Sequence, residues 1–448
     1  MPNTNAATSP ALSESSITCE LEVFKPEQAL VTPKVLLTDT TRYSCATRLA
    51  SALARAGIDV SAVLPARGHP LRMTRALREI FPYSGLHPLD SLGAAIQVAA
   101  PHFIVPCDDT GVQHLHELHE HSHRLGLLGG SIAALIERSL GAPESYPIVS
   151  SRYDLLRIAR EEGLCVPDMS PIYRLEDFEA WAACQRLPWV LKVDGTWGGR
   201  GVRVAHTRNE AEQFFSRMIR PLGAAHILRR LIVNRDPFPL RPWWNREERR
   251  ILVQSYIEGR PSNCAVVCKD GRLLAGIAVD VVSSLGPTGP ATIVRVVDSP
   301  AMLGCAERLA HRLKLTGFFG LDFVIEDGSG DTYLIEMNPR GTPLCHLQLG
   351  KGRDMIDALW AQLSNRPPRE TPPVTQSDLI AYFPQAWQAI AELPPSSYQD
   401  IPPDEPELVR EILHPWPDRS LLARAYNQIW ECWLRLTSES TPSPTLKG

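Results

Sequence analysis

The chain has 448 residues, of which 44% are hydrophobic and 21% are charged, as in an ordinary globular protein. This length is too great for one compact core, and about two to four domains are expected. A net charge of −4 and a pI near 6.4 exclude the basic surface that nucleic-acid binding needs. Residues 1–20 lack an apolar signal segment, and no run of about 18 apolar residues occurs. We therefore expect a cytoplasmic protein without a membrane or nucleic-acid partner.

The first part of the chain alternates between strand and helix patterns. Residues 1–30 are rich in Ser, Thr, Asn and Ala, and we expect a flexible tail there. The apolar run "KVLLTDT" begins at Lys34, and the helical pattern "SCATRLASALARAG" ends at Gly57. A second strand, "IDVSAVLPA", follows, and after an intervening helix comes a third, "HFIVPCDDT". Such alternation predicts a parallel sheet with helices on its faces, and we assign this α/β domain to residues 31–145.

The next part, residues 146–365, is dominated by hairpins. A helix "SSRYDLLRIAREEG" that ends at Gly163 leads into it. One hairpin joins the apolar runs 189–193 and 202–205, a second turns at Asp270-Gly271, and a third turns around Ser329. Hairpins build antiparallel sheets, so an α+β architecture is predicted after the α/β domain. Residues 366–448 are proline-rich and are interpreted as an extension with a helix at its end.

The third hairpin, "GFFGLDFVIEDGSGDTYLIEMNPR", carries a group of acidic and amide side chains. If the turn is centred on Ser329, Asp322 lies opposite Glu336 with Cβ atoms about 5 Å apart. Asn338 and Arg340 follow on the same face. Two carboxylates and an amide oxygen are ligands that Mg²⁺ prefers. The hairpin therefore predicts a magnesium site, and the alternative is a solvent-facing acidic pair.

The first hairpin carries a glycine-rich loop with Gly195, Gly198, Gly199 and Gly201, and Lys192 stands before it. Its spacing fits neither a P-loop nor a dinucleotide fingerprint. Alone, such a loop is more often a mobile turn. Beside a magnesium site, we interpret it as a phosphate-binding loop, since glycine lets backbone N–H groups approach phosphate oxygens and a lysine adds charge.

A β-prone segment, residues 250–257, lies between these two hairpins and ends at Glu258-Gly259. The end of a strand leaves main-chain groups free, and such groups can bind an adenine edge. The alternative interpretation is a core strand.

In order, the residues show a helix, a lysine-bearing strand, a glycine hairpin, the strand "VQSYIEG", and the hairpin of "GLDF" and "LIEMNPR". This order resembles the ATP-grasp superfamily, in particular its carbamoyl-phosphate-synthetase and biotin-carboxylase branch. The first domain resembles the pre-ATP-grasp domain of that family. The resemblance covers residues 34–365, and it implies a two-subdomain ATP-grasp fold with antiparallel sheets.

The resemblance also implies roles for individual residues. Lys192 would bind the ATP phosphates, and Arg340 would lie beside the transferred phosphate. Main-chain groups of Tyr256 and Ile257 would meet adenine. An acid that usually binds the ribose has no clear counterpart, because Pro261-Ser262-Asn263 stands at its position, and Glu258 is the substitute. The implied nucleotide-binding set is Arg152, Lys192, Gly198, Gly199, Gly201, Gln254, Tyr256, Ile257 and Glu258. The implied metal ligands are Asp322, Glu336 and Asn338.

Three further features have two interpretations each. His116, His119 and His123 share a helical face, which suits Zn²⁺ or Ni²⁺ but also an ordinary solvated face. The acids 108 and 109 follow a strand, where they would line a substrate or cap the next helix. Arg295, in a segment with a flexible loop, would hold a substrate carboxylate or phosphate.

These features together predict an ATP-dependent carboxylate–amine ligase that forms an acyl phosphate with ATP and Mg²⁺ (or Mn²⁺). Its partners would be a small-molecule carboxylate and an amine, and a homodimer is allowed. Three alternatives stay open: carbamoyl-phosphate or carboxylase chemistry with bicarbonate, a small-molecule kinase, and a non-catalytic ATP-binding regulatory protein. No glutamine-hydrolysing domain or biotin carrier is recognisable in the sequence, which disfavours a complete synthetase.

Overall fold

The computed structural model describes residues 32–41, 45–65, 68–122, 126–193, 201–219, 224, 227–228, 251–286, 288–389 and 393–413. The chain divides into Met1–Val31 and a compact unit, Thr32–Gly448, to which every element below belongs. Several predictions fall outside the described residues. They concern the tail 1–30, Gly195, Gly198, Gly199, His123 and the helix at the C-terminal end.

The first α/β region contains a four-stranded parallel sheet in the order β3-β2-β1-β4. Its strands are β1 (Lys34–Thr38), β2 (Asp59–Pro65), β3 (Leu77–Tyr83) and β4 (Phe103–Pro106). Its helices are α1 (Cys45–Arg55), α2 (Pro88–Ala99), α3 (Asp109–Ser122) and α4 (Gly126–Leu140), with a 3₁₀ turn η1 (Pro70–Met73). The parallel sheet is confirmed. Strand β3 was not predicted, because its exposed Arg78 and Glu79 hide an edge strand in the apolar pattern.

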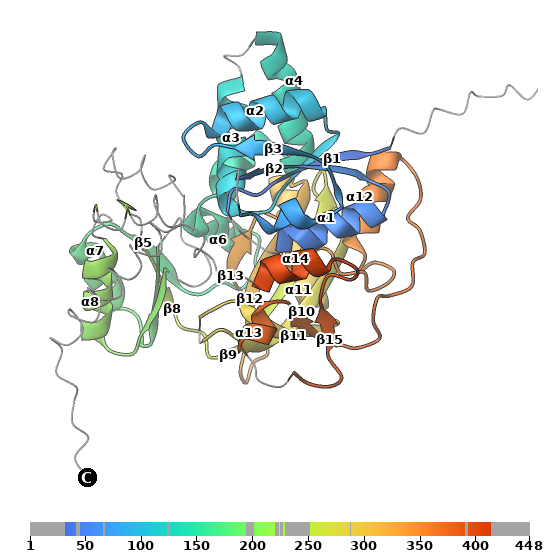
Figure 1. The fold of residues 1–448 in the computed structure, drawn as a ribbon. Coiled ribbons are helices and arrows are strands. Elements are labelled where there is room, and N and C mark those ends of the chain that lie inside the picture. The colour runs from blue at the N-terminus through green and yellow to red at the C-terminus, as the bar shows by residue number, and fades with distance from the viewer. Residues whose placement is uncertain are drawn as a thin grey trace, which may run out of the picture. The chain divides into compact units, whose positions relative to one another are not determined.

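The parallel sheet is buried on both faces because its strands are apolar at successive positions. Val35 and Leu37 point toward α1, where they pack with Leu49 and Leu53. Leu36 points the other way, into a cluster with α2, α3 and α4 (Figure 1). Helix α1 ends before Gly57, whose φ of +83° suits glycine, as predicted.

The second region is a four-stranded antiparallel sheet in the order β5-β8-β6-β7. Its elements are β5 (Met169–Ile172), α7 (Leu175–Ala182), β6 (Trp189–Val193), β7 (Val202–Ala205), α8 (Arg208–Met218) and β8 (Ile251–Ser255). Strands β6 and β7 have the predicted bounds. One face packs on α7 and α8 through Phe178, Leu191 and Phe215. The other face carries Lys192.

The third region is a seven-stranded sheet in the order β13-β12-β9-β10-β11-β14-β15. Its strands are β9 (Gly259–Lys269), β10 (Arg272–Ser284), β11 (Ala291–Val297), β12 (Gly317–Glu326), β13 (Thr332–Asn338), β14 (Leu379–Tyr382) and β15 (Tyr398–Asp400). All neighbours are antiparallel except β14 and β15. The turn at Asp270-Gly271 has φ values of 50° and 77°, the geometry of a tight hairpin.

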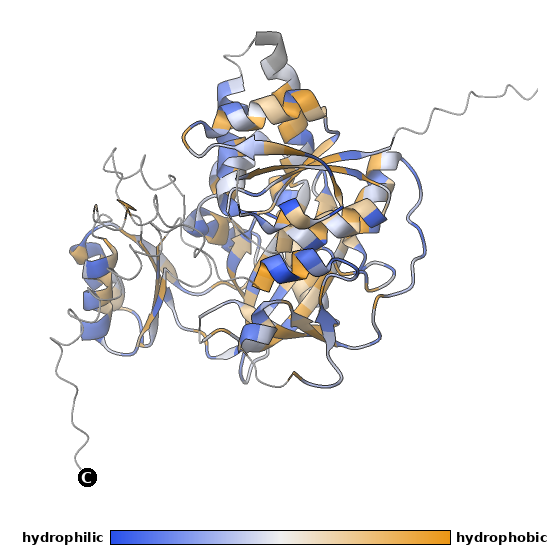
Figure 2. Cartoon of the chain, in the orientation of Figure 1, coloured by the Kyte–Doolittle hydropathy of each residue, from blue (hydrophilic) through white to orange (hydrophobic). Residues whose placement is uncertain are grey.

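Helices cover both faces of this sheet. One face packs on α6 (Arg152–Glu161) and α11 (Pro300–Leu313), and the other packs on α1 and α12 (Met355–Ser364). The remaining elements are η2 (Pro143–Ser145), α5 (Tyr146–Val149), α13 (Gln385–Ala389) and α14 (Pro406–Leu413). Figure 2 shows hydrophobic residues concentrated on the strands and on the inner sides of the helices. Among the described residues, no helix combines the length and hydropathy needed to cross a bilayer.

The predicted fold class is confirmed: a parallel α/β region precedes two antiparallel sheets. Strands β14 and β15 are an addition to the prediction. They come from the proline-rich part of the chain, and they form one end of the seven-stranded sheet, next to β11.

Candidate active site

The hairpin of β12 and β13 brings the predicted metal ligands together. Asp322 pairs with Glu336 and Gly320 pairs with Asn338, as predicted. Nearer the turn, however, Phe323 pairs with Leu334, so the register shifts by one residue. Ile335 is the extra residue of a β-bulge. The turn is therefore centred between Gly328 and Ser329, and the bulge restores the predicted pairing at the site.

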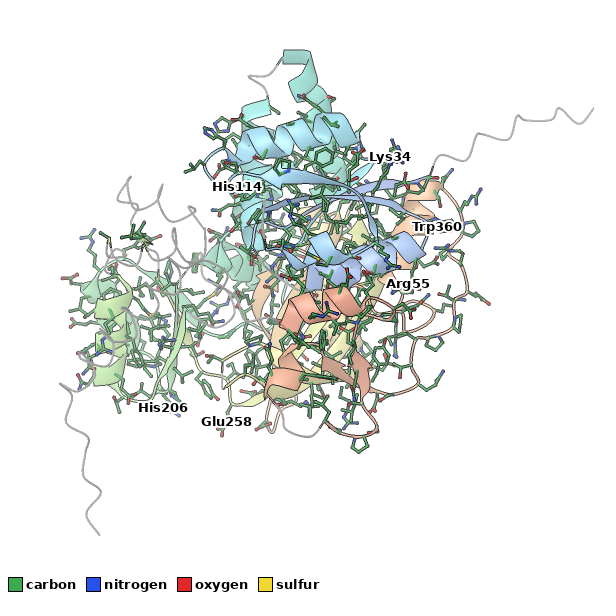
Figure 3. The ribbon with its side chains drawn as sticks, viewed as in Figure 1. Lys34, Arg55, His114, His206, Glu258 and Trp360 are labelled. Carbon is green, nitrogen blue, oxygen red and sulfur yellow. The ribbon has the colours of Figure 1, made fainter. Side chains whose placement is uncertain are left out.

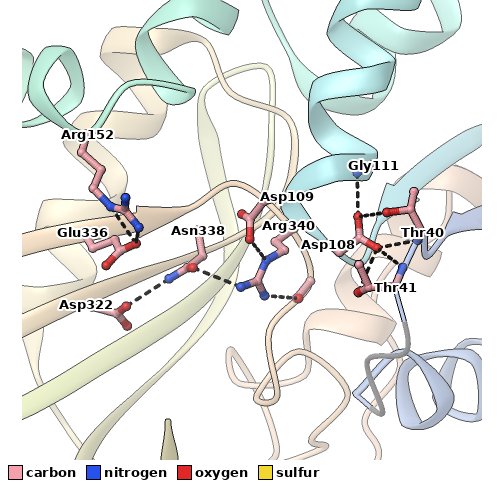
Figure 4. Close-up of polar contacts among 11 residues, drawn as sticks. Thr40, Thr41, Asp108, Asp109, Gly111, Arg152, Asp322, Glu336, Asn338 and Arg340 are labelled. Carbon is pink, nitrogen blue, oxygen red and sulfur yellow. Dashed lines mark hydrogen bonds and ion pairs between the residues drawn. The ribbon is translucent and has the colours of Figure 1, made fainter. Parts of the chain in front are cut away.

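A chain of polar contacts runs from this hairpin to the first α/β region (Figure 4). Asn338 donates from Nδ2 to Asp322 Oδ2 at 3.1 Å, and it accepts at Oδ1 from Arg340 Nη2 at 3.2 Å. Arg340 Nε donates to Asp109 Oδ2 at 3.0 Å. Asp109 is the first residue of α3. The site thus joins an edge strand of the seven-stranded sheet to the parallel sheet's carboxyl end.

Glu336 forms an ion pair with Arg152, at the start of α6 (Figure 4). Arg152 donates to Glu336 Oε1 from Nε at 3.1 Å and from Nη2 at 2.7 Å. It also donates from Nη1 to the carbonyl oxygen of Val193 at 2.7 Å. Val193 is the last residue of β6 before the glycine-rich loop. Arg152 therefore connects the two antiparallel sheets at the position where the phosphates were predicted.

Lys192 is buried, and its Nζ donates to the carbonyl oxygen of Ile335 at 3.0 Å. Ile335 is the bulged residue, and a bulge leaves main-chain groups outside the regular ladder. Burial lowers the pKa of Lys192 to about 8, and the negative charge of Glu336 opposes that shift. Lys192 therefore lies near enough to Glu336 for their charges to interact.

The two carboxyl groups have opposite pKa shifts. Burial and the charge of Glu336 raise the pKa of Asp322 to about 6. Burial also raises the pKa of Glu336, but the positive charges of Arg152, Lys192 and Arg340 outweigh it, and the net pKa is lowered. The surroundings therefore favour the charged form of Glu336 and disfavour the charged form of Asp322. Among the described residues, no group of three or more His, Cys, Asp or Glu side chains forms a metal site.

The predicted adenine-binding segment follows β8. The N–H of Tyr256 donates to Pro188 O at 3.1 Å, whereas the N–H of Ile257 has no hydrogen-bond partner among the described residues. Gln254 is buried, and its Nε2 also has no partner within the described part of the chain. Gln254 pairs with Val190, two residues from Lys192, so both side chains lie on the same face of the sheet.

Two neighbouring residues shape the ends of this segment. Glu258 is exposed (Figure 3). A Cβ atom on Gly259 would lie 2.1 Å from the carbonyl oxygen of Ile325, so only glycine permits this approach of β9 to β12. Gly201 accepts at its carbonyl oxygen from the Val193 N–H at 3.1 Å, which closes the described base of the glycine-rich hairpin.

Arg295 is not brought to this site. The register places Asp322, Asn263, Val279 and Val296 in one cross-strand row. Arg295 precedes Val296, and its side chain therefore points to the opposite face. It forms an exposed ion pair with Asp378 instead.

The acids after β4 divide the two predicted roles between them. Asp108 accepts from the N–H groups of Thr40, Thr41 and Gly111, so it caps α3 and fixes the loop after β1 (Figure 4). Asp109 instead reaches Arg340. The sequence allowed either role for the pair but offered no signal for the contact between Asp109 and Arg340.

The histidines of α3 serve packing. His114 contacts the Tyr83 hydroxyl at 3.0 Å, and His119 contacts Glu137 Oε1 at 2.8 Å. His116 stacks on the ring of Tyr146, and burial lowers its pKa to about 3. These described histidines therefore connect α3 to neighbouring elements, and no metal group forms among them.

Comparison with known proteins identifies the domain. Residues 149–343 match the family model of the ATP-grasp domain. No curated protein matches the chain in sequence. Many solved structures resemble it, among them the following three. Biotin carboxylase from Campylobacter jejuni has 15% identity and a TM-score of 0.54 over 78% of this chain and 74% of that one. N5-carboxyaminoimidazole synthetase from Staphylococcus aureus has 11% identity and a TM-score of 0.53, over 75% of this chain and 79% of that one. L-amino acid ligase from Bacillus licheniformis has 13% identity and a TM-score of 0.51, over 76% of each chain.

At these sequence identities the solved structures support the fold alone, and the match to the family model supports the assignment of the domain. Residues 149–343 form an ATP-grasp domain. This match confirms the predicted ATP-grasp domain within residues 149–343. The finer assignment to the carbamoyl-phosphate-synthetase branch stays a prediction.

Proposed function

We propose that this chain is an ATP-dependent carboxylate–amine ligase that works through an acyl phosphate. The observation that carries the proposal is the meeting of two opposite charge sets across the antiparallel sheets. Lys192 and Arg152 lie against the β12–β13 hairpin, which presents Asp322 and Glu336. Positive groups for phosphate and negative groups for a divalent cation are what Mg·ATP requires.

Asp322, Glu336 and Asn338 fit a magnesium or manganese ion. They offer two carboxylates and an amide, which suits a cation that keeps water and phosphate oxygens as its other ligands. The amide of Asn338 would turn to present Oδ1 to the ion, because in this structure its Nδ2 faces Asp322 and its Oδ1 accepts from Arg340. The raised pKa of Asp322, caused by burial and by Glu336, is relieved when a cation lies near both carboxylates. Bound Mg²⁺ would neutralise phosphate charge. Glu336 would exchange Arg152 for the ion.

The nucleotide would lie on the face of the β5–β8 sheet that carries Lys192 and Gln254. Lys192, Arg152 and the glycines 198, 199 and 201 would bind its phosphates. Within the described part of the chain, the N–H of Ile257 and the Nε2 of buried Gln254 have no acceptor, and an adenine edge would supply acceptors for these donors. The main-chain N–H of Tyr256 is engaged with Pro188, so Tyr256 would contribute its other groups. Glu258 stays the proposed ribose contact.

The rest of the proposed catalysis depends on positioning the substrates and on stabilising the developing charge. Arg340 would stabilise the transferred phosphate, and a substrate carboxylate oxygen would attack that phosphate in line. An amine then replaces phosphate at the activated carbonyl. The L-amino acid ligase among the structural relatives, by its name, supports amide formation. The carboxylate and the amine are proposed by class only.

The test measures ADP release by the purified protein with Mg·ATP, carboxylates and amines. Glu336→Ala is compared with Glu326→Ala, a change in the same hairpin at a carboxylate that accepts a hydrogen bond from the Ser329 hydroxyl. We expect turnover that needs both an acid and an amine, that is lost in Glu336→Ala and that is kept in Glu326→Ala. Turnover with the acid alone would indicate a kinase, and turnover with bicarbonate would indicate the carboxylase alternative. ATP binding without ADP from any combination would contradict the ligase.

The division into residues 31–145, 146–365 and 366–448 is likewise our proposal, as is a homodimer. Light scattering of the full chain would test the second.

A further inference from the structure

We propose that Asp109, in the first α/β region, is a positioning residue for Arg340. Its carboxylate would hold the guanidinium in the orientation that receives the transferred phosphate. This inference rests on the proposed function. It means that the parallel sheet contributes to the phosphate end of the site and is more than a support.

The contacts of Arg340 are the first argument. Nε donates to Asp109 Oδ2 at 3.0 Å, Nη2 donates to Asn338 Oδ1 at 3.2 Å, and Nη1 donates to the Gly341 carbonyl oxygen at 3.3 Å. Each of the three nitrogens thus has an acceptor. The contact with Asp109 is the shortest of these three and is charge-assisted, so it contributes strongly to the orientation of the guanidinium. The side chains are 12% and 32% exposed, which limits screening by water.

The main chain around Arg340 is held separately, which is the second argument. The Gly341 N–H donates to the carbonyl oxygen of Pro106, at the end of β4, at 2.9 Å. A Cβ atom on Gly341 would lie 3.1 Å from Leu49 Cδ2, so glycine allows this close approach to α1. Loss of the Asp109 carboxylate would therefore release the Nε side of the Arg340 guanidinium without detaching the backbone of Arg340.

The third argument is the division of labour between the two adjacent acids. Asp108 carries the local contacts to Thr40, Thr41 and Gly111. The side chain of Asp109 instead contacts Arg340, which lies 231 positions further along the chain. A residue that served only the helix start would duplicate Asp108. The contact with Arg340 gives Asp109 a separate role.

The consequence is specific to the transferred phosphate. Arg340 without Asp109 would keep its charge and its contact with Asn338, but the guanidinium would shift toward the nearby carboxylate of Asp322. Binding of a nucleotide that carries a third phosphate would then weaken. Binding of a diphosphate would not, because Lys192 and Arg152 are untouched.

The experiment is calorimetric titration of the full chain with Mg·ADP and with a non-hydrolysable Mg·ATP analogue. We expect Asp109→Asn to weaken the analogue about five- to tenfold and to leave ADP unchanged. In an Arg340→Ala background, Asp109→Asn should have no further effect, because the two residues act as a unit. Asp378→Asn, which breaks an exposed Arg–Asp pair elsewhere, is the control.

Three outcomes separate the two proposals. An unchanged ratio of analogue to ADP affinity in Asp109→Asn would overturn the positioning role. So would equal effects of Asp109→Asn in the wild-type and Arg340→Ala backgrounds. A wild-type protein that binds neither nucleotide would overturn the proposed function itself, and the positioning role with it.

Discussion

A buried ion pair connects the C-terminal strands to the first α/β region, and its removal yields a quantitative prediction. Arg48 Nε in α1 lies 2.6 Å from Asp400 Oδ2 in β15, and their side chains are only 5% and 4% exposed. Asp400 Oδ1 also lies 2.8 Å from His346 Nε2. Arg48 further donates to the Phe383 carbonyl oxygen. The substitution Asp400→Asn removes the negative charge and keeps the volume, so it creates no cavity.

The expected cost is large because Arg48 would stay buried without a carboxylate. Breaking one side of a buried ion pair costs about 3–5 kcal/mol. The chain contains a matched exposed pair, Arg295 and Asp378, whose side chains are 47% and 56% exposed. Water already solvates that pair, and Asp378→Asn should cost about 1 kcal/mol or less. The same chemical change is thus expected to differ several-fold between the two places.

Urea unfolding followed by tryptophan fluorescence measures the difference. With a denaturant dependence of about 3 kcal/mol/M, Asp400→Asn should lower the midpoint by about 1 M, against about 0.3 M for Asp378→Asn. Adding Arg48→Met to Asp400→Asn should recover part of the loss, since no buried cation then remains unpaired. Equal midpoints for the two single variants would refute the reasoning. A double variant less stable than Asp400→Asn would show that the packing of Arg48, rather than its charge, matters.

Three further predictions concern ionisation and the metal ligands. Burial lowers the pKa of Lys192 to about 8, so its positive charge is lost above that pH. Calorimetry should therefore show that Mg·ATP binds about tenfold more weakly at pH 9 than at pH 7. The variant Lys192→Arg should show no such loss of affinity. Arg152→Gln frees Glu336 from its ion pair, so Mn²⁺ measured by electron paramagnetic resonance should bind the nucleotide-free protein more tightly while Mg·ATP binds more weakly. If the affinities for Mn²⁺ and for Mg·ATP changed in the same direction, the idea that Arg152 and the cation compete for Glu336 would be contradicted. Burial and the charge of Asp39 raise the pKa of Asp108 to about 7, so its contribution to stability is present below about pH 4 and is lost as pH rises through about 7. The Tm of Asp108→Asn should therefore fall less than that of the wild type between pH 6 and pH 8, and parallel curves would argue against this titration.

Much of the local structure followed from short stretches of sequence. The bounds of β6 and β7, the glycine that ends α1 and the turn at Asp270-Gly271 all depend on residues within a few positions of one another. The pairing of Asp322 with Glu336 was also predicted, although the turn is half a residue away from its expected centre. A bulge at Ile335 compensates, and no residue type at that position signals a bulge.

The sequence by itself determined the order of the elements, the two sheet types and the acidic hairpin, because periodicity and turn chemistry act over short distances along the chain. Tertiary structure alone decided which side chains meet. Arg152 reaches Glu336 across 184 positions, and Arg340 reaches Asp109 across 231. It also turned Arg295 away from the site and added β14 and β15 to the sheet. These contacts depend on how separate sheets pack against one another, and packing is a property of whole surfaces that no local pattern of residues encodes.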